Sequence, residues 1–497
     1  MSAECEVVVV GSGPSGAMAA EQLVRAGVSV TMLESGLRPP HGVIVRAAGR
    51  TVFRWRSMEA LSSDRHIATG DPLTEFWSSL SPGGLSNYWT AAVPRFAPED
   101  FTDGARIDER FRWPVSYDEL IPFYEAAEAH LSITGPAAPI PALPVGLTRH
   151  QPAVPSDWQT LLSGALRDEL TVLPLARGGR WMVAGRGSEF NSYHIIARPL
   201  QRHREFELRL GAHVTRLIQQ RFGAVEGVEY FDSASGSLRT IRACAVVLAA
   251  GTIDTTRILL SSVSTASPAS LGNEYGLVGR YVHDHPRDWW PVEFERPLTL
   301  LDHPLYLARA AYGTSPPLSG ASATIGLAAT RDLVQTWIGR KGRRFGVQVF
   351  GTMTPSEHHM IQLSADRVDR FGLPRVEIDI RYDDAALATL SGMRDRFAKV
   401  FADAGAPVRL ETSDWVPRPG SSIHYAGAVR MHANPEFGVL DSWNRVHSCP
   451  NVVVVDMSSF TTNPEKNPTL TAMALSARAA RKLADDIRTG GGAAAHL

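Results

Sequence analysis

The hydrophobic pattern near both ends of the chain predicts parallel β-strands, each followed by a helix. Residues 7–10 form a continuous apolar run, and residues 28–33 form a second one after an amphipathic stretch. Near the other end, residues 451–456 read NVVVVD and are followed by apolar residues at helical spacing. Short apolar runs rich in β-branched residues are typical of strands buried inside a parallel sheet. The pattern therefore predicts an α/β fold with a Rossmann-like nucleotide-binding sheet. The expected buried face of the last helix consists of Leu470, Met473, Ala474, Ala477 and Leu483.

The central part of the chain alternates between two kinds of pattern, which predicts two interleaved domains. Strand-like segments before residue 251 resemble the rest of the nucleotide-binding sheet, returning after an insertion. Strand-like runs at 345–352, 360–364 and 375–380 indicate a second lobe of α+β type built on a largely antiparallel sheet, with a helix near 384–401. We expect a discontinuous nucleotide-binding domain and a substrate-binding domain. Their predicted ranges are 1–100, 188–290 and 419–497 for the first, and 101–187 and 291–418 for the second.

The segment Gly11-Ser12-Gly13-Pro14-Ser15-Gly16 lies between the first strand and the first helix. In a dinucleotide-binding turn, Gly11 would make the tight turn, Gly13 would let the backbone approach a pyrophosphate, and Gly16 would permit close helix–strand packing. Glu34 ends the second strand, where an acid can bind a ribose hydroxyl and would repel the 2′-phosphate of NADP. The motif alone does not separate FAD from NAD.

The last predicted helix begins with Asn467-Pro468-Thr469. Asparagine is a good N-cap, and proline suits the first helical position because no amide hydrogen is needed there. The N-terminus of this helix would offer N–H groups and a partial positive charge to an anionic group, for example a reduced flavin. His424 precedes Asn467 by 43 positions.

Composition narrows the function classes. The chain has 497 residues, of which 44% are hydrophobic and 20% charged, and its net charge is −1. Without a basic excess we expect no nucleic-acid partner, and without a long apolar run we expect no membrane span. The start of the chain lacks a signal-peptide pattern, and Cys5, Cys244 and Cys449 have no metal-type spacing, so we expect a cytoplasmic protein without a metal site.

Several separate segments, in this order, resemble the glucose–methanol–choline (GMC) flavoprotein oxidoreductases over nearly the whole chain. The segment GGLSNYWTAAVPRF is most similar to the pyranose-oxidase-like branch, which oxidises sugars and glycosides. The matching segments are GSGPSG at 11–16 with Glu34, GGLSNYWT at 83–90, WPVSY at 113–117, AAGT at 249–252, VGR at 278–280, DHP at 284–286, His424 with Gly427, Arg430 and Met431, and residues 451–475.

This resemblance implies FAD as the cofactor and His424 with Asn467 as the catalytic pair. The branch often attaches its flavin covalently through a histidine where this chain has Tyr88, so we expect FAD to be non-covalent. Asp456, at a strand end, is a candidate partner for the ribityl chain. The residues expected to contact the cofactor are Gly11, Ser12, Gly13, Pro14, Ser15, Gly16, Glu34, Ser35, Ser86, Asn87, Thr90, Ala91, Val214, Ala250, Gly251, Asp456, Met457, Pro468 and Thr469.

The expected reaction is oxidation of an alcohol, with a secondary one favoured, on a sugar-like, glycoside or aminoglycoside substrate. His424 would take the hydroxyl proton, because a neutral imidazole suits that task near pH 7, while hydride passes to flavin N5. Asn467 would bind the same oxygen. The electron acceptor, O2 or another, stays open. Two alternatives also stay open, a hydroxynitrile-lyase-like enzyme that contains FAD and an NAD-dependent dehydrogenase. His283-Asp284-His285 is interpreted as a turn at the lobe boundary rather than a metal pair.

Overall fold

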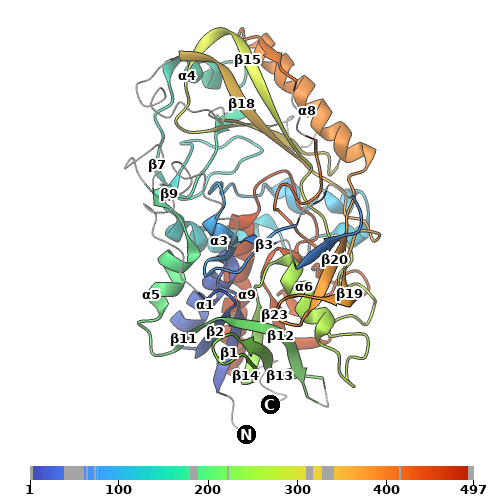
Figure 1. The fold of residues 1–497 in the computed structure, drawn as a ribbon. Coiled ribbons are helices and arrows are strands. Elements are labelled where there is room, and N and C mark those ends of the chain that lie inside the picture. Colours follow the sequence, from blue (N-terminus) through green and yellow to red (C-terminus); the bar gives the residue numbers. More distant parts are fainter. Residues whose placement is uncertain are drawn as a thin grey trace.

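The computed structural model of the protein describes residues 4–37, 61–62, 65–71, 74, 76–178, 188–220, 223–308, 317–326, 341–412 and 416–490. Two main sheets divide the molecule into a lower and an upper lobe (Figure 1). Both ends of the chain lie at the base of the lower lobe, so segments from the two ends of the sequence are neighbours in space (Figure 1).

The lower lobe contains the predicted parallel sheet. Its parallel strands follow the order β11, β2, β1, β14 and β23. Val8 pairs with Val246, and Val246 pairs in turn with Val452, all three fully buried. Helices and further strands cover this sheet, which is why its strands are apolar on both faces. The bounds are β1 Cys5–Val10, β2 Val30–Glu34, β11 Phe206–Leu210, β14 Ser237–Leu248 and β23 Cys449–Val454, extended by the antiparallel strands β12 Ala212–Gln219, β13 Val225–Asp232 and β22 Arg445–Val446.

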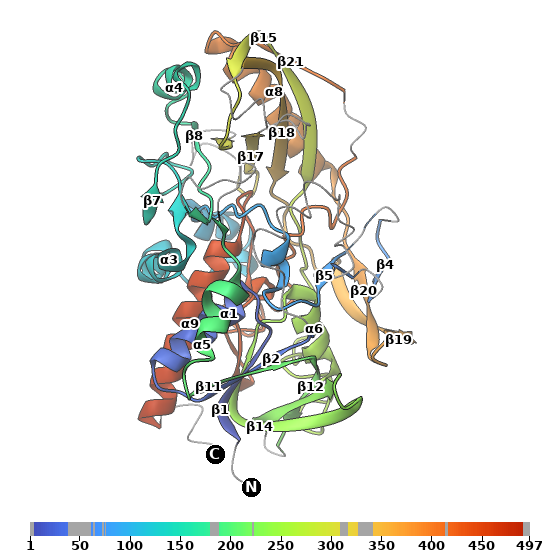
Figure 2. The same ribbon diagram turned by 60° about the vertical axis from the view of Figure 1, so that its left-hand side comes forward.

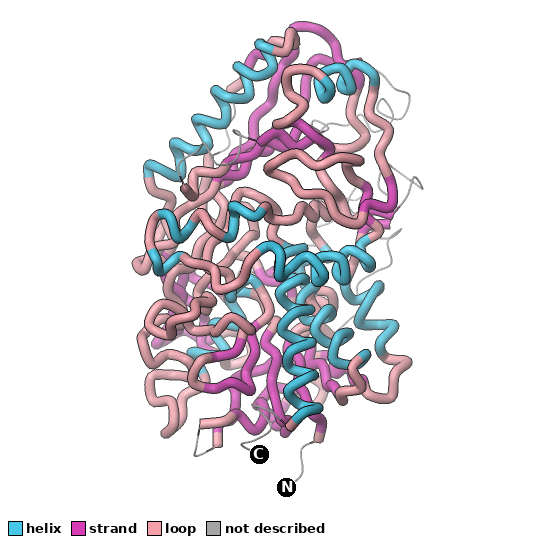
Figure 3. Tube along the Cα trace, turned by 180° about the vertical axis from the view of Figure 1, so that it is seen from behind, coloured by secondary structure: helices cyan, strands magenta, loops and turns pink. Residues whose placement is uncertain are grey.

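Helices α1 (Pro14–Arg25), α3 (Tyr117–Leu131) and α9 (Thr469–Thr489) pack together beside this sheet, as the view from behind shows (Figure 3). The predicted apolar face of α9 is buried as expected. The predicted cap is wrong: Pro468 occupies the N-cap position, no side chain caps the helix, and the helix begins at Thr469. The carboxamide of Asn467 is therefore not used by the helix. The lobe also contains α5 (Arg198–Leu200) and α6 (Thr252–Ser261).

The upper lobe is built on an entirely antiparallel six-stranded sheet (Figure 2). One face packs against helices α4 (Ser156–Ser163) and α8 (Asp384–Asp403) around Trp290, Phe294 and Val347. The other face is turned toward the lower lobe. Its strands, in spatial order, are β21 Val408–Leu410, β15 Arg287–Thr299, β18 Lys341–Gly351, β17 Ala321–Gly326, β16 Leu305–Ala308 and β8 Leu170–Val172.

Two of the three predicted upper-lobe strands lie elsewhere. β19 (Met360–Val368) and β20 (Pro374–Asp379) form a separate three-stranded sheet with β4 (His66–Ala68). The remaining short elements are β3 Leu61–Ser62, β5 Ser78–Ser79, β6 Ile133–Thr134, β7 Thr148–His150, β9 Arg177–Gly178, β10 Ser188–Glu189, η2 Gly84–Asn87, η3 Pro98–Phe101, η4 Gly104–Arg106, η5 Glu109–Phe111, η6 Tyr193–Ala197 and η7 Met457–Ser459. No helix in the described part of the chain has the length and apolarity to cross a bilayer.

Candidate active site

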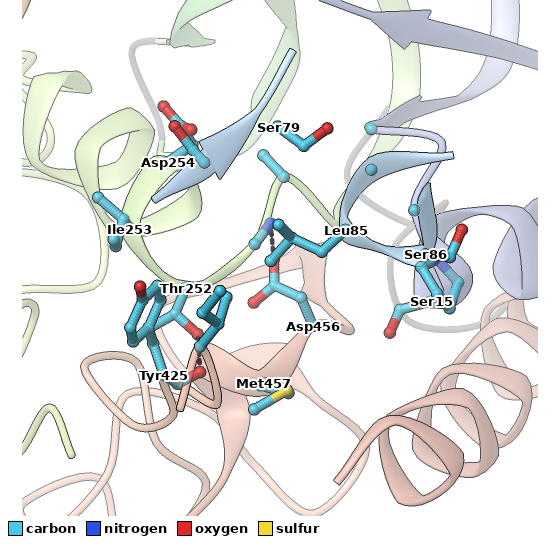
Figure 4. A pocket seen from close by; sticks show the side chains of 18 of the residues that line it. Ser15, Ser79, Leu85, Ser86, Thr252, Ile253, Asp254, Tyr425, Asp456 and Met457 are labelled. Carbon is cyan, nitrogen blue, oxygen red and sulfur yellow. Dashed lines mark hydrogen bonds between the residues drawn. The ribbon is translucent and has the colours of Figure 1, made fainter. Parts of the chain in front are cut away.

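A continuous cavity runs from the carboxyl ends of the parallel strands to the lower-lobe face of the six-stranded sheet. One end is lined by the turns after β1 and β14 and by the segment after β23 (Figure 4). The other end is lined by His424, Asn467 and residues of β15 and β18. Ligands of open α/β sheets bind at the carboxyl ends of strands, so the position agrees with the sequence motif.

The glycine-rich turn supplies an open helix N-terminus to this cavity. Gly13 is the N-cap of α1 without any side-chain cap, and the first intrahelical bond runs from Ala17 N to Gly13 O at 2.9 Å. A Cβ at Gly13 would meet no atom within 4 Å, whereas one at Gly16 would lie 2.0 Å from Gly11 O. Gly13 therefore leaves room for a ligand, and Gly16 permits backbone packing. Free N–H groups at such a turn favour an anion.

Glu34 lies at the end of β2 with its carboxylate fixed. It accepts hydrogen bonds from Ser12 N at 3.0 Å, Ser12 Oγ at 2.5 Å and Gly36 N at 2.7 Å. Glu34 and Ser35 both line the cavity.

Asp456 joins the two other turns at this end (Figure 4). One carboxylate oxygen accepts from Gly251 N at 3.0 Å and from the Thr255 hydroxyl, and the other accepts from Ser458 N at 3.0 Å. Burial raises the pKa of Asp456, and these hydrogen bonds oppose that effect. The carboxylate thus holds the start of α6 against the segment after β23.

The structure brings most of the predicted cofactor residues to the cavity wall. Four do not line it, namely Gly16, Asn87, Ala91 and Pro468. Asn87 instead donates to Pro82 O and Gly84 O and thereby closes its own turn. The predicted residues that line the cavity are Gly11, Ser12, Gly13, Pro14, Ser15, Glu34, Ser35, Ser86, Thr90, Val214, Ala250, Gly251, Asp456, Met457 and Thr469, together with His424 and Asn467.

These surroundings fit FAD. The uncapped N-termini of α1 and α9 both reach the cavity, so one can face a pyrophosphate and the other a flavin ring that carries negative charge when reduced. The absent side chain at Gly13 leaves the approach to α1 unobstructed.

His424 and Asn467 face each other at the other end of the cavity. His424 Nε2 lies 3.2 Å from Asn467 Nδ2, and His424 Nδ1 lies 3.0 Å from Nδ1 of His285. The amide group donates to Nε2, so the imidazole proton resides on Nδ1 and is donated to His285. The lone pair of His424 Nε2 therefore accepts the hydrogen bond from Asn467, and both side chains line the cavity.

Burial lowers the pKa of His424 well below 6.5, and the neighbouring His285 and Arg287 lower it further. Burial also lowers the pKa of His285, to about 4. Both imidazoles are therefore neutral at pH 7, which is consistent with one proton shared between the two Nδ1 atoms. A neutral His424 can accept a proton.

The backbone of His424 is held by Asp284, which the sequence suggested only as part of a turn. Asp284 accepts from Gly420 N at 2.9 Å, from His424 N at 3.0 Å and from the Ser422 hydroxyl. Asn463 Nδ2 donates to His424 O at 3.1 Å from the opposite side.

Sequence reasoning assigned no chemistry to several residues of this end of the cavity. His285 was known only as a motif residue, and Arg287, Gln348 and Phe350 belong to no motif at all. The Phe350 ring centroid lies 5.1 Å from that of His424. Strand register brings these side chains together, and the sequence contains no local signal for it.

Two family models match the chain, one described as GMC oxidoreductase at residues 358–476 and one as FAD binding domain at residues 4–68. The chain contains a GMC oxidoreductase C-terminal domain and an FAD-binding domain. The GMC model covers His424 and Asn467, and the FAD-binding model covers the turn at Gly13 and Glu34.

Relatives of this GMC oxidoreductase extend along its whole length. It is 29% identical to a 2-methyl-1,2-propanediol dehydrogenase of Mycolicibacterium austroafricanum, over 96% of this chain and 94% of that protein. It is also 29% identical to a 6′′′-hydroxyparomomycin C oxidase of Streptomyces lividus, over 97% and 92%. The fold matches the crystal structure of pyridoxine 4-oxidase from Mesorbium loti with a TM-score of 0.69 at 17% identity, over 96% and 99%. The protein is thus an FAD-dependent oxidoreductase that acts on alcohols.

Proposed function

We propose that this GMC oxidoreductase oxidises a secondary ring alcohol of a sugar-like, glycoside or aminoglycoside substrate. The observation that carries the proposal is the His424–Asn467 pair on the cavity wall, with Nε2 and Nδ2 only 3.2 Å apart. One relative, by its name, oxidises a hydroxylated paromomycin, which is an aminoglycoside, and another oxidises a small diol. Together these support a hydroxyl-bearing substrate.

The proposed chemistry divides between two side chains. The alcohol oxygen would replace the direct bond between Asn467 and His424, accepting a hydrogen bond from Asn467 Nδ2 and donating its proton to His424 Nε2. His424 then carries the proton while its Nδ1–H remains bound to His285, so the imidazole keeps its orientation. FAD, when bound, supplies the acceptor for the hydride that leaves the carbinol carbon. Positioning of this kind can lower a barrier by several kcal/mol because the reacting groups are already aligned.

We also propose that FAD is held without a covalent bond. Tyr88 lines the cavity where the related branch has its linking histidine, and a phenol cannot form the histidyl bond. Acid precipitation would release all flavin into the supernatant if this holds, and flavin retained on the protein would contradict it.

Anaerobic mixing with a panel of sugars, glycosides and polyols tests the main proposal. We expect loss of the oxidised-flavin absorbance with at least one secondary alcohol. His424→Ala should retain FAD and lose this reduction, since the imidazole contributes to proton removal rather than to cofactor binding. Reduction at an unchanged rate in His424→Ala would exclude the imidazole as the base.

A further inference from the structure

The lower-lobe face of the six-stranded sheet carries a row of side chains that the proposed chemistry does not use, and Gln348 in this row lines the cavity. Strand register aligns Tyr306 with Thr324, Thr324 with Gln348, and Gln348 with Trp289. The row therefore crosses β16, β17, β18 and β15 at one level. Neighbouring strands lie about 4.8 Å apart, so the part from Thr324 to Trp289 is roughly 10 Å long.

The alternation of buried residues fixes the face on which this row lies. The sequence neighbours Trp290, Val347 and Ala323 are fully buried in the core under α8. Successive side chains of a strand point to opposite faces, so Trp289, Gln348 and Thr324 point toward the lower lobe. The pairing of β15 with β18 runs without a bulge from Arg287 to Glu293. The alternation of side chains between the two faces of the sheet is therefore regular throughout this stretch.

The row begins beside the catalytic pair. Gln348 lines the cavity, and Phe350, two residues along β18, packs against the ring of His424. Two residues of a strand correspond to roughly 7 Å. The row therefore lies about the width of one sugar ring away from the place where the reacting carbon would be bound.

Three side chains in the row offer unused binding groups. Trp289, Gln348 and Thr324 are each partly exposed, and none of the three side chains makes a hydrogen bond to a described residue. No aromatic or cationic side chain of the described residues packs on the Trp289 ring. By contrast, Tyr306 at the inner end is buried and donates to Glu465 Oε1 at 2.8 Å. Among the described residues the row is thus closed at its Tyr306 end, and Trp289 is its last member on β15.

We infer that this row is an outer subsite that binds a second, uncharged pyranose ring of the substrate. Trp289 would stack on the apolar face of that ring, while the amide of Gln348 and the hydroxyl of Thr324 would bind its hydroxyl groups. An aromatic wall with a few polar groups is the usual composition of a small-molecule site. The inference rests on the proposed function and makes it narrower: the preferred substrate is a glycoside of two or more rings.

The test compares single-ring methyl hexosides with the matching methyl disaccharides. Binding is measured by calorimetry on the FAD-loaded His424→Ala protein, in which turnover is blocked, and flavin reduction is measured on the otherwise unaltered enzyme. Adding Trp289→Ala should weaken disaccharide binding about tenfold and leave the single-ring compounds unchanged. Gln348→Met, which keeps the side-chain volume, should act in the same direction if the first variant folds poorly.

Glu293→Ala is the matched control, because this residue is on the same face of β15 but farther from the cavity and pairs with Arg409. It should alter neither class of ligand. Equal binding of both classes by the starting protein, or equal weakening of both by Trp289→Ala, would overturn the outer subsite while leaving the proposed oxidation intact. Failure of every single-ring and two-ring compound to reduce the flavin would overturn the proposed function and this inference with it.

Discussion

Replacing His285 by leucine should slow flavin reduction by the alcohol substrate roughly tenfold to a hundredfold while FAD stays bound. Nδ1 of His285 accepts the proton of His424 Nδ1 across 3.0 Å in a buried setting. Leucine leaves that N–H without an acceptor, which costs about 1–3 kcal/mol. Each 1.36 kcal/mol changes a rate about tenfold. If the cost destabilises the reactive orientation of His424 by its full amount, it accounts for the stated decrease in the rate of flavin reduction.

Anaerobic stopped-flow measurement of flavin bleaching provides the assay. The limiting rate should fall, while the substrate concentration at half-maximal rate should change little, because His285 does not line the cavity. His285→Asn should recover much of the rate, since its amide oxygen can accept the same proton. A structural role alone would make both variants equally slow or would lower their flavin content. Either of those results, or an unchanged rate in the leucine variant, would refute the role of His285 in orienting His424.

Three further predictions follow from other parts of the structure. Because burial above all lowers the pKa of His424, its neutral base form persists from neutral to alkaline pH. The rate of flavin reduction at low substrate should therefore stay constant above pH 6.5 and fall only on acidification below it, as a pH profile would show. Gly13→Asp should fold normally, because a Cβ there meets no atom within 4 Å, yet purify without flavin absorbance because a carboxylate enters the cavity at the end of α1. Lys466→Met should lower the free energy of unfolding by about 3–5 kcal/mol, measured by denaturant titration, because Asp100 and Glu465, each 2.9 Å from Lys466 Nζ, would lose the cation between them.

Controls come from the same chain. Lys399→Met removes an exposed lysine that pairs with Asp403 at 2.8 Å, and it should change the free energy of unfolding by well under about 1 kcal/mol. An equal effect of the two lysine substitutions would contradict the importance of burial at Lys466. A reduction rate that rises steadily between pH 7 and 9 would contradict a neutral His424, and flavin-replete Gly13→Asp would contradict the cofactor position.

The parts of the fold that local sequence determines were predictable. The Gly11–Gly16 turn, the strand that ends at Glu34 and the apolar face of α9 combine a periodic pattern with characteristic turn residues. The residue capping α9 was predicted incorrectly, because asparagine's preference for that position ignores the partner that Asn467 finds in His424. Tertiary contacts outweighed a local preference here.

The strands and contacts of the upper lobe were harder to predict from the sequence. β15 contains Pro291 and Pro297, which argue against a strand, yet it pairs with β18 over most of its length. The contact between His285 and His424 joins residues 139 positions apart, and no spacing rule indicates it. The predicted domain boundaries and the catalytic roles stay predictions.

The order in which the ribosome makes this chain has a consequence for its maturation. α1 emerges early, but its partner α9 and the strand β23 beside β14 are made last. Throughout most of translation the nascent protein therefore exposes an apolar helix face and an unpaired strand edge, both of which favour aggregation. The cavity that fits the cofactor is completed only when the segment after β23 and the start of α9 have been made, because both line it.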